Sequence, residues 1–122
     1  LNNIVKERNC QEKEHTILKK IDIELNHLHF NFSYNETKYL KECIYELYIK
    51  NELDFENLSK NIYPIIAKKH HKSANNIHTN IKQSVQSMCC DCDENTINSY
   101  FNNTFFVKPT VKEIIFTILN KL

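Results

Sequence analysis

The sequence contains no glycine and no tryptophan, and only two of its 122 residues are proline. Sheet-rich folds use glycine at turns and bulges, so its absence favours short helices joined by turns, in which asparagine is the next best residue for a positive φ angle. No apolar run approaches the ~20 residues that span a bilayer, and no secretory leader opens the chain. We therefore expect a soluble, cytoplasmic protein that does not contact a membrane.

The length of 122 residues suits one domain with a modest core and is too short for two domains. Residues 1–14 mix charge and asparagine without periodicity, which predicts a linker or tail. Residues 15–122 are then expected to form the folded domain. Because Leu1 is not a start methionine, we expect this chain to be a piece of a longer protein.

Amphipathic periodicity along residues 15–122 predicts an all-α fold, a compact bundle of about six helices. The expected helices cover about residues 15–28, 35–50, 54–69, 73–89, 95–101 and 111–121. Asp54 is a candidate N-cap of the third helix, which Pro64 either kinks or interrupts by opening a new helix at its first turn. Thr110 and Glu113 predict a capping box at the start of the last helix.

The stretch from Ser73 to Cys89 has the clearest pattern in the chain. Its apolar residues recur on one stripe of a helix, while almost everything between them is polar: Ala74, Ile77, Ile81, Val85 and Met88. Ser73 stands at the N-cap position, where its hydroxyl can accept a backbone N–H of the first turn. The opposite face is rich in amides and free of acid: Lys72, Asn75, Asn76, Thr79, Lys82, Gln83 and Gln86. Such a face suits the edges of nucleic-acid bases.

Charge is unevenly distributed along a chain whose formal net charge is only +1. Residues 1–56 carry eleven of the fifteen Asp and Glu residues, whereas residues 57–90 carry none. This acid-free window holds Lys60, Lys68, Lys69, Lys72 and Lys82, together with His70, His71 and His78. A local charge of about +5 is the footprint that phosphate binding needs. The alternative is a solvated basic face with no partner.

The segments on either side of residues 70–72 have the plan of a helix-turn-helix. A helix with basic residues at its end is followed by a brief break and then by the capped helix that starts at Ser73. DNA-binding proteins of this class place their second helix in the major groove. We therefore predict that the recognition helix covers about residues 73–89.

Three of the five cysteines lie together, at positions 89, 90 and 92. Cys89 and Cys92 form a CxxC pair, but a structural zinc site needs four ligands and the remaining cysteines stand singly. A redox dithiol has its nucleophile at a helix N-terminus, whereas this pair is expected at a helix C-terminus, where the dipole opposes thiolate formation. We expect cytosolic thiols with no metal and no cofactor, and a metal or redox role is the alternative.

The sequence offers no catalytic constellation. It has no glycine-rich phosphate loop and no GxSxG or HExxH motif, and its paired carboxylates lie in solvated acidic runs. His70 and His71 lie beside lysines, so they would need a carboxylate brought in by folding to act in catalysis. We therefore predict no catalytic residues and no enzymatic activity.

With these elements placed, the sequence resembles a known family, the C-terminal DNA-binding effector domain of the sporulation initiation response regulator (stage zero sporulation protein A). The resemblance covers about residues 17–122 in unbroken order. It is carried by YLKECI (39–44), YPIIAKKH (63–70), the SA at 73–74 with Ile77 and Ile81, the IxxYF run at 97–101, and KPTVKEII (108–115) with the closing NKL. The resemblance implies six helices, of which the fourth is the recognition helix.

The resemblance also implies partners and marks departures from the family. Members act as tandem dimers on promoter DNA and contact RNA polymerase sigma subunits. Their recognition helices carry arginines at the positions of Asn76, Thr79 and Lys82. At the first two positions this chain has lost both the positive charge and the guanidinium group that pairs bidentately with guanine. The connection between Phe101 and Lys108 is also shorter than in the family. Whether a receiver domain precedes the chain stays open at this stage.

The leading hypothesis from the sequence is a DNA-binding transcriptional regulator that binds double-stranded DNA, as a homodimer if the family's arrangement holds. The phosphate contacts would come from Lys68, Lys69, Lys72 and Lys82, and the base-facing residues would be Asn75, Asn76, Thr79 and Gln83; Ser73 is also expected at the DNA interface. The rival is a divergent relative that no longer binds DNA and acts as a protein-interaction module. The last helix is so apolar that we expect part of it at a dimer or partner interface: Ile114, Ile115, Ile118 and Leu119.

Overall fold

The computed structural model describes residues 2–50 and 58–122, with the side chains of residues 11–50, 58 and 60–122. All regular elements within these ranges are helical, which confirms the predicted fold class. In chain order they are α1 (Asn2–His27), α2 (Asn35–Ile49), the single π-helical turn η1 (Leu58–Ile62), α3 (Tyr63–His70), α4 (Ala74–Asp91), α5 (Glu94–Phe101) and α6 (Val111–Lys121).

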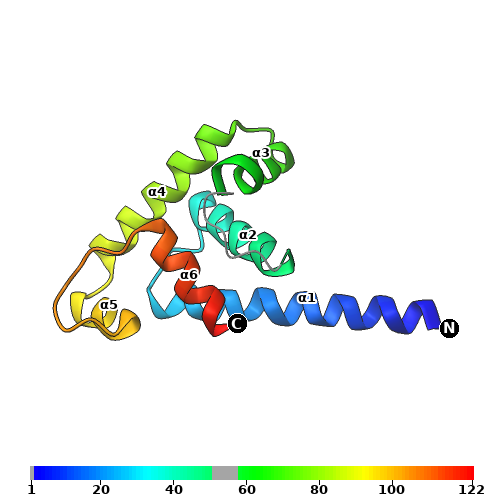
Figure 1. Ribbon diagram of the computed structural model, residues 1–122, viewed down its shortest axis with the longest axis horizontal. Helices are drawn as coiled ribbons and strands as arrows, with labels where there is room; N and C mark the ends of the chain where they lie inside the picture. Colours follow the sequence, from blue (N-terminus) through cyan, green and yellow to red (C-terminus); the bar gives the residue numbers. More distant parts are fainter. Residues whose placement is uncertain (1, 51–57) are drawn as a thin grey trace.

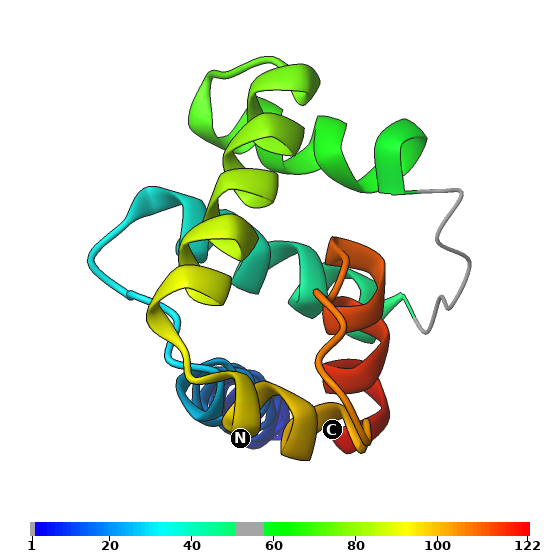
Figure 2. The same cartoon turned by 90° about the vertical axis from the view of Figure 1, so that its left-hand side faces the viewer.

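α2 lies in the middle of the molecule, between α1 and α3 (Figure 1). α1 runs along one side of the molecule, and its N-terminal part extends beyond the other helices. α3 and the start of α4 lie on the opposite side, the turn that joins them points away from α1, and α4 runs from there toward α5. Figure 2, which views α1 nearly end-on, shows α5 and α6 on the α1 side of the molecule. The helix-turn-helix therefore forms one end of the domain.

The core is built around α2, which packs against α1, α3, α4 and α6. Four residues on one face of α2 are all buried, at no more than 1% exposure: Leu40, Cys43, Ile44 and Leu47. The apolar seam of α4 meets this surface, because α2 and α3 are its main neighbours. Each fully buried aliphatic side chain of this kind stabilises the fold by about 1.5 to 3 kcal/mol.

The first helix begins at Asn2, so the prediction that it starts near residue 15 was wrong. Residues 2–14 contain no proline or glycine and several strong helix formers, so the helix continues without an apolar stripe. Side chains 11–16 are exposed, and Ile17 and Leu18 are half-buried. The division into a tail at 1–14 and a domain at 15–122 stays a prediction.

Three turns place a residue other than glycine in the left-handed region: His29 (φ 61°), His71 (φ 57°) and Asn102 (φ 57°). Asparagine was expected at such positions, and Asn102 confirms it, but histidine occupies the other two. A left-handed residue with a Cβ costs roughly 1 to 2 kcal/mol. The cost at His71 is offset by closing hydrogen bonds, since His71 N–H donates to the Lys68 carbonyl at 3.4 Å and Lys72 N–H to the Ala67 carbonyl at 2.9 Å.

Pro64 lies in the first turn of α3, so it opens a new helix rather than kinking a longer one. Its missing N–H is harmless there because the first-turn donors have no partner inside the helix. The expected cap at Asp54 lies outside the described residues. At the start of α6 the capping box is confirmed, with Glu113 N–H donating to Thr110 Oγ1 at 3.2 Å and Thr110 N–H donating to Glu113 Oε2 at 3.4 Å.

A partly buried hydrogen bond joins α5 to α1. The Tyr100 hydroxyl donates to Glu24 Oε2 at 2.8 Å, and Lys121 Nζ lies 4.0 Å from the Tyr100 ring centroid. Burial, followed by the hydrogen bond to Glu24, raises the pKa of Tyr100 well above its ordinary value, so the hydroxyl stays a donor. Side chains from α1, α5 and α6 therefore meet at Tyr100.

α6 buries the residues that the sequence assigned to a partner interface. Ile114, Ile115 and Ile118 are each 0% exposed within the domain, and Leu119 is half-buried against the same core. α6 can bury so wide a stripe because it packs against both α2 and α4. Ile114, Ile115 and Ile118 are therefore enclosed within this domain, and a dimer or partner surface on α6 stays a prediction. Phe116, at 43% exposure, is an α6 side chain that does reach the surface.

Replacing Ile118 by Ala should lower the free energy of unfolding by about 2 to 5 kcal/mol, because the enclosed side chain leaves a cavity. The matched substitution Phe116→Ala should cost much less, because that side chain is already half in water. Urea unfolding followed by helical circular dichroism measures both losses. Equal losses at the two positions would contradict the burial described for α6.

Candidate nucleic-acid interface

α4 presents the polar face that the sequence predicts. Its seam is enclosed, since Ile77 and Ile81 are 0% exposed, Met88 1% and Val85 4%, while Ala74 is half-buried. Every predicted residue of the opposite face is exposed: Lys72, Asn75, Asn76, Thr79, Lys82, Gln83 and Gln86. Because the seam is fixed against α2 and α3, the polar face is held in one orientation toward solvent.

The start of α4 is capped as predicted. Ser73 Oγ accepts the backbone N–H of Asn76 at 3.0 Å, and the Ser73 backbone is extended rather than helical. The first turn of α4 carries no acidic residue, and the last turn of α3 carries Lys68, Lys69 and His70. The positive end of the α4 dipole thus lies beside a cluster of cations, which suits binding of an anion.

Glu42 of α2 reaches the end of α3 and offsets part of this charge. Its Oε1 lies 3.0 Å from Lys69 Nζ and its Oε2 lies 2.6 Å from His70 Nε2. The His70 ring also packs on Tyr39, with 4.9 Å between ring centroids. No signal in the acid-free window could reveal Glu42, because it is 27 residues from Lys69 along the chain. The contact fixes α3 on α2.

This arrangement gives His70 the carboxylate that catalysis would require. Among the described residues, however, no hydroxyl or thiol bonds His70, and the contacts it makes are with Glu42 and Tyr39. The pair therefore positions α3 and supplies no nucleophile. Within the same residues, Lys68, Lys72 and Lys82 have no carboxylate within 4.0 Å, so their charges face solvent.

Asn80 is a residue of this face that the sequence analysis missed. Its Nδ2 donates to Asn76 Oδ1 at 2.8 Å, and its side chain is half-buried. The spacing of four residues along a helix was the signal that could have found it. The bond holds the Asn76 amide in one orientation, with its Nδ2 donors and one oxygen lone pair still available.

The two flanks of the α4 face have different surroundings. Lys82 borders a cavity that it shares with His78 and with the first turn of α6. Gln83 borders a second hollow, beside Tyr34 and Glu36 at the start of α2. The N-terminal part of α4, between these flanks and the α3 turn, is therefore the region where cations and amides gather without an acid.

The cysteines at the end of α4 are free thiols: Cys89 is half-buried, Cys90 exposed and Cys92 buried. Burial raises the pKa of Cys89 and of Cys92, so both favour the uncharged thiol at neutral pH. Throughout the part of the chain that the structure describes, no group of three His, Cys, Asp or Glu side chains is arranged to hold a metal ion.

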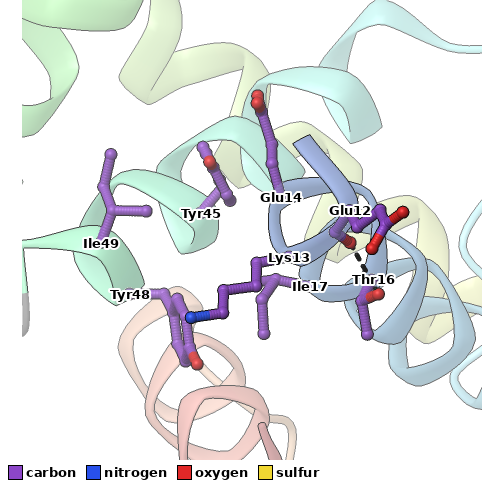
Figure 3. Close-up of a pocket in the computed structure, with 8 residues that line it drawn as sticks. All are labelled: Glu12, Lys13, Glu14, Thr16, Ile17, Tyr45, Tyr48 and Ile49. Atoms are coloured by element: carbon purple, nitrogen blue, oxygen red, sulfur yellow. Dashed lines mark hydrogen bonds between the residues drawn. The ribbon is translucent and has the colours of Figure 1, made fainter. Parts of the chain in front are cut away.

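A groove of about 870 Å³ lies between the protruding part of α1 and the end of α2 (Figure 3). Lys13 extends from α1 toward Tyr48 of α2, and Ile17 and Tyr45 contribute apolar surface. Its two carboxylates, from residues 12 and 14, outnumber its single lysine. The groove therefore does not complement a phosphate backbone. None of the helices within residues 2–50 and 58–122 has the length and apolar character needed to cross a membrane.

Comparison with known proteins agrees with this geometry. The model of one protein family, described as the C-terminal domain of the sporulation initiation factor Spo0A, matches residues 21–122. The search of curated proteins found no match. The family consists of DNA-binding effector domains that regulate transcription, and it is not an enzyme family. Because the match covers the chain from the middle of α1 to its last residue, the chain belongs to the family of Spo0A C-terminal domains.

Proposed function

We propose that this chain binds double-stranded DNA through the outer face of α4 and regulates transcription. The observation that carries the proposal is the exposed, acid-free and amide-rich face of a capped helix, held on its buried side by α2 and α3. The family of the chain supports the same general function.

The dimensions of α4 suit the major groove. From Asn75 to Gln86 the face is about 16 Å long at 1.5 Å per residue, and the major groove of B-DNA is about 12 Å wide. The N-terminal end of a recognition helix is the part that contacts base edges. This is the end of α4 at which Lys68 and Lys72 gather.

The roles of the residues follow from their side chains and surroundings. Lys68, Lys72 and Lys82 contact phosphates, and Lys69 contributes less because Glu42 already pairs with it. The residues that face the bases are Asn75, Asn76, Thr79 and Gln83, and Ser73, which caps α4, lies beside them at the DNA interface. Asparagine and glutamine pair bidentately with adenine, whereas arginine favours guanine. We infer a preference for adenine where the arginine-bearing relatives read guanine.

A second function, that of a protein-interaction module without DNA binding, is favoured by one observation. Glu42 reduces the positive charge next to α4, and the face carries a single lysine between residues 74 and 91. A homodimer on DNA and a contact with a sigma subunit would both follow from the family's arrangement. Any dimer surface must then use residues other than the buried isoleucines of α6.

The salt dependence of DNA binding distinguishes the two functions. If three or four lysines contact phosphates, log K should fall against log salt with a slope of roughly −3 to −4. Lys68→Gln should make the slope less steep by about 1, because one phosphate contact is lost. Lys38→Gln, an exposed lysine on α2, is the matched control and should change nothing. Fluorescence anisotropy with a labelled duplex measures the slope, and absence of binding at low salt would favour the interaction module.

Restoring arginine at Asn76 and Thr79 should raise affinity for the guanine-bearing box of the family. Each bidentate contact with guanine discriminates by about 1 to 3 kcal/mol. The control variant, Asn26→Arg with Asn120→Arg, carries its two arginines on α1 and α6. It adds the same charge but places no guanidinium group against the bases. Equal gains in both double variants would show that charge alone matters and would contradict base reading by α4.

A further inference from the structure

A cavity of about 450 Å³ lies between α4, the start of α3 and the first turn of α6, and we name it the α4–α6 cavity. Its floor is apolar. Leu58 and Val85 are 2% and 4% exposed, and Val111 of α6 is half-buried beside them. Ligand sites in proteins are typically hollows of roughly 300 to 1,000 Å³ with mainly apolar walls. The size and the walls of this cavity match that description.

Two rings line one wall of the cavity. The Tyr63 and His78 ring centroids are 5.5 Å apart, and the ring planes are tilted by 52°. Burial, with a smaller effect of Cys43, raises the pKa of Tyr63 to about 12, so the phenol carries no negative charge at neutral pH. Aromatic walls pack well against a flat or aliphatic apolar body.

The rim of the cavity is cationic. Lys82 comes from α4, Lys108 from the segment before α6 and Lys112 from its first turn, and none of the described residues that line the cavity is acidic. In the described part of the chain these three lysines have no carboxylate within 4.0 Å. Glu113, which follows Lys112, is turned into the capping box with Thr110. The positive charge at the rim is therefore not offset locally.

We propose that the α4–α6 cavity binds an organic anion with an apolar body. The body packs on Leu58, Tyr63 and Val85, and the acidic group of the ligand lies among the three lysines. The apolar part would lose water on binding, which supplies most of the affinity, and the lysines would select the charged ligand over a neutral one of the same shape.

Lys82 belongs both to this rim and to the proposed DNA face. A ligand anion held by Lys82 would remove one phosphate contact, so ligand and DNA would weaken each other's binding by the same factor. The cavity and its rim do not depend on DNA binding, because Lys112 lies on α6 and Lys108 lies in the segment that precedes it. The test is therefore made on the chain without DNA.

Two fluorescent probes test the proposal. Anilinonaphthalene sulfonate and N-phenylnaphthylamine share one apolar ring system, and only the first is an anion. The sulfonate should bind the folded chain with one-to-one saturation and roughly tenfold more tightly than the neutral probe at low salt, as expected for partly exposed ion pairs. The double variant Lys108→Gln with Lys112→Gln should lose most of this tenfold preference and keep its affinity for the neutral probe.

The control variant, Lys19→Gln with Lys38→Gln, removes two exposed lysines from α1 and α2 and should bind both probes as the wild type does. Methyl resonances of Val85 and Val111 should shift on adding the sulfonate, which locates the site. Equal affinity for the two probes, a preference that survives in the double variant of Lys108 and Lys112, or methyl shifts confined to the groove between α1 and α2 would overturn the proposal.

Discussion

Burial of the apolar seam of α4 against α2 and α3 is the contact on which the rest of the structure depends. Four enclosed side chains fix the rotation of α4 about its axis: Ile77, Ile81, Val85 and Met88. Each contributes about 1.5 to 3 kcal/mol to stability. Rotating the helix about its axis would therefore lose more stabilisation than any single surface contact provides. The same rotation sends every amide and lysine of the opposite face into solvent. A packing constraint thereby sets the orientation of the face through which we propose that the chain binds DNA.

Electrostatics around α4 result from folding as much as from sequence. The window without acids places cations around the turn between α3 and α4, but Glu42 of α2 pairs with Lys69 and His70. The pairing fixes α3, which positions the start of α4, at the expense of free positive charge. Among the described residues, Lys68 and Lys72 beside the start of α4 and Lys82 midway along it have no carboxylate within 4.0 Å, and Lys82 also borders the α4–α6 cavity.

Local patterns predicted much of this structure because they depend on neighbours in sequence. The all-α class, the Ser73 cap, the capping box at Thr110 and the seam of α4 follow from spacing along one helix, and all are present. The features that these patterns did not reveal involve contacts between distant segments. The burial of Ile118 depends on α2 and α4 closing over α6, and the ion pair of Glu42 joins residues 27 apart. The early start of α1 was missed because residues 2–14 carry no apolar stripe, the pattern from which helices were predicted.

The most direct test of the central claim, that the outer face of α4 meets DNA, is a map of backbone amide resonances with and without duplex DNA at low salt. The account predicts the largest changes between residues 68 and 83, with His71 and Lys72 in the turn included. The amides beside the groove between α1 and α2, at residues 12–17 and 45–49, should stay unchanged. Changes confined to that groove or to α6, or no change anywhere, would contradict the account.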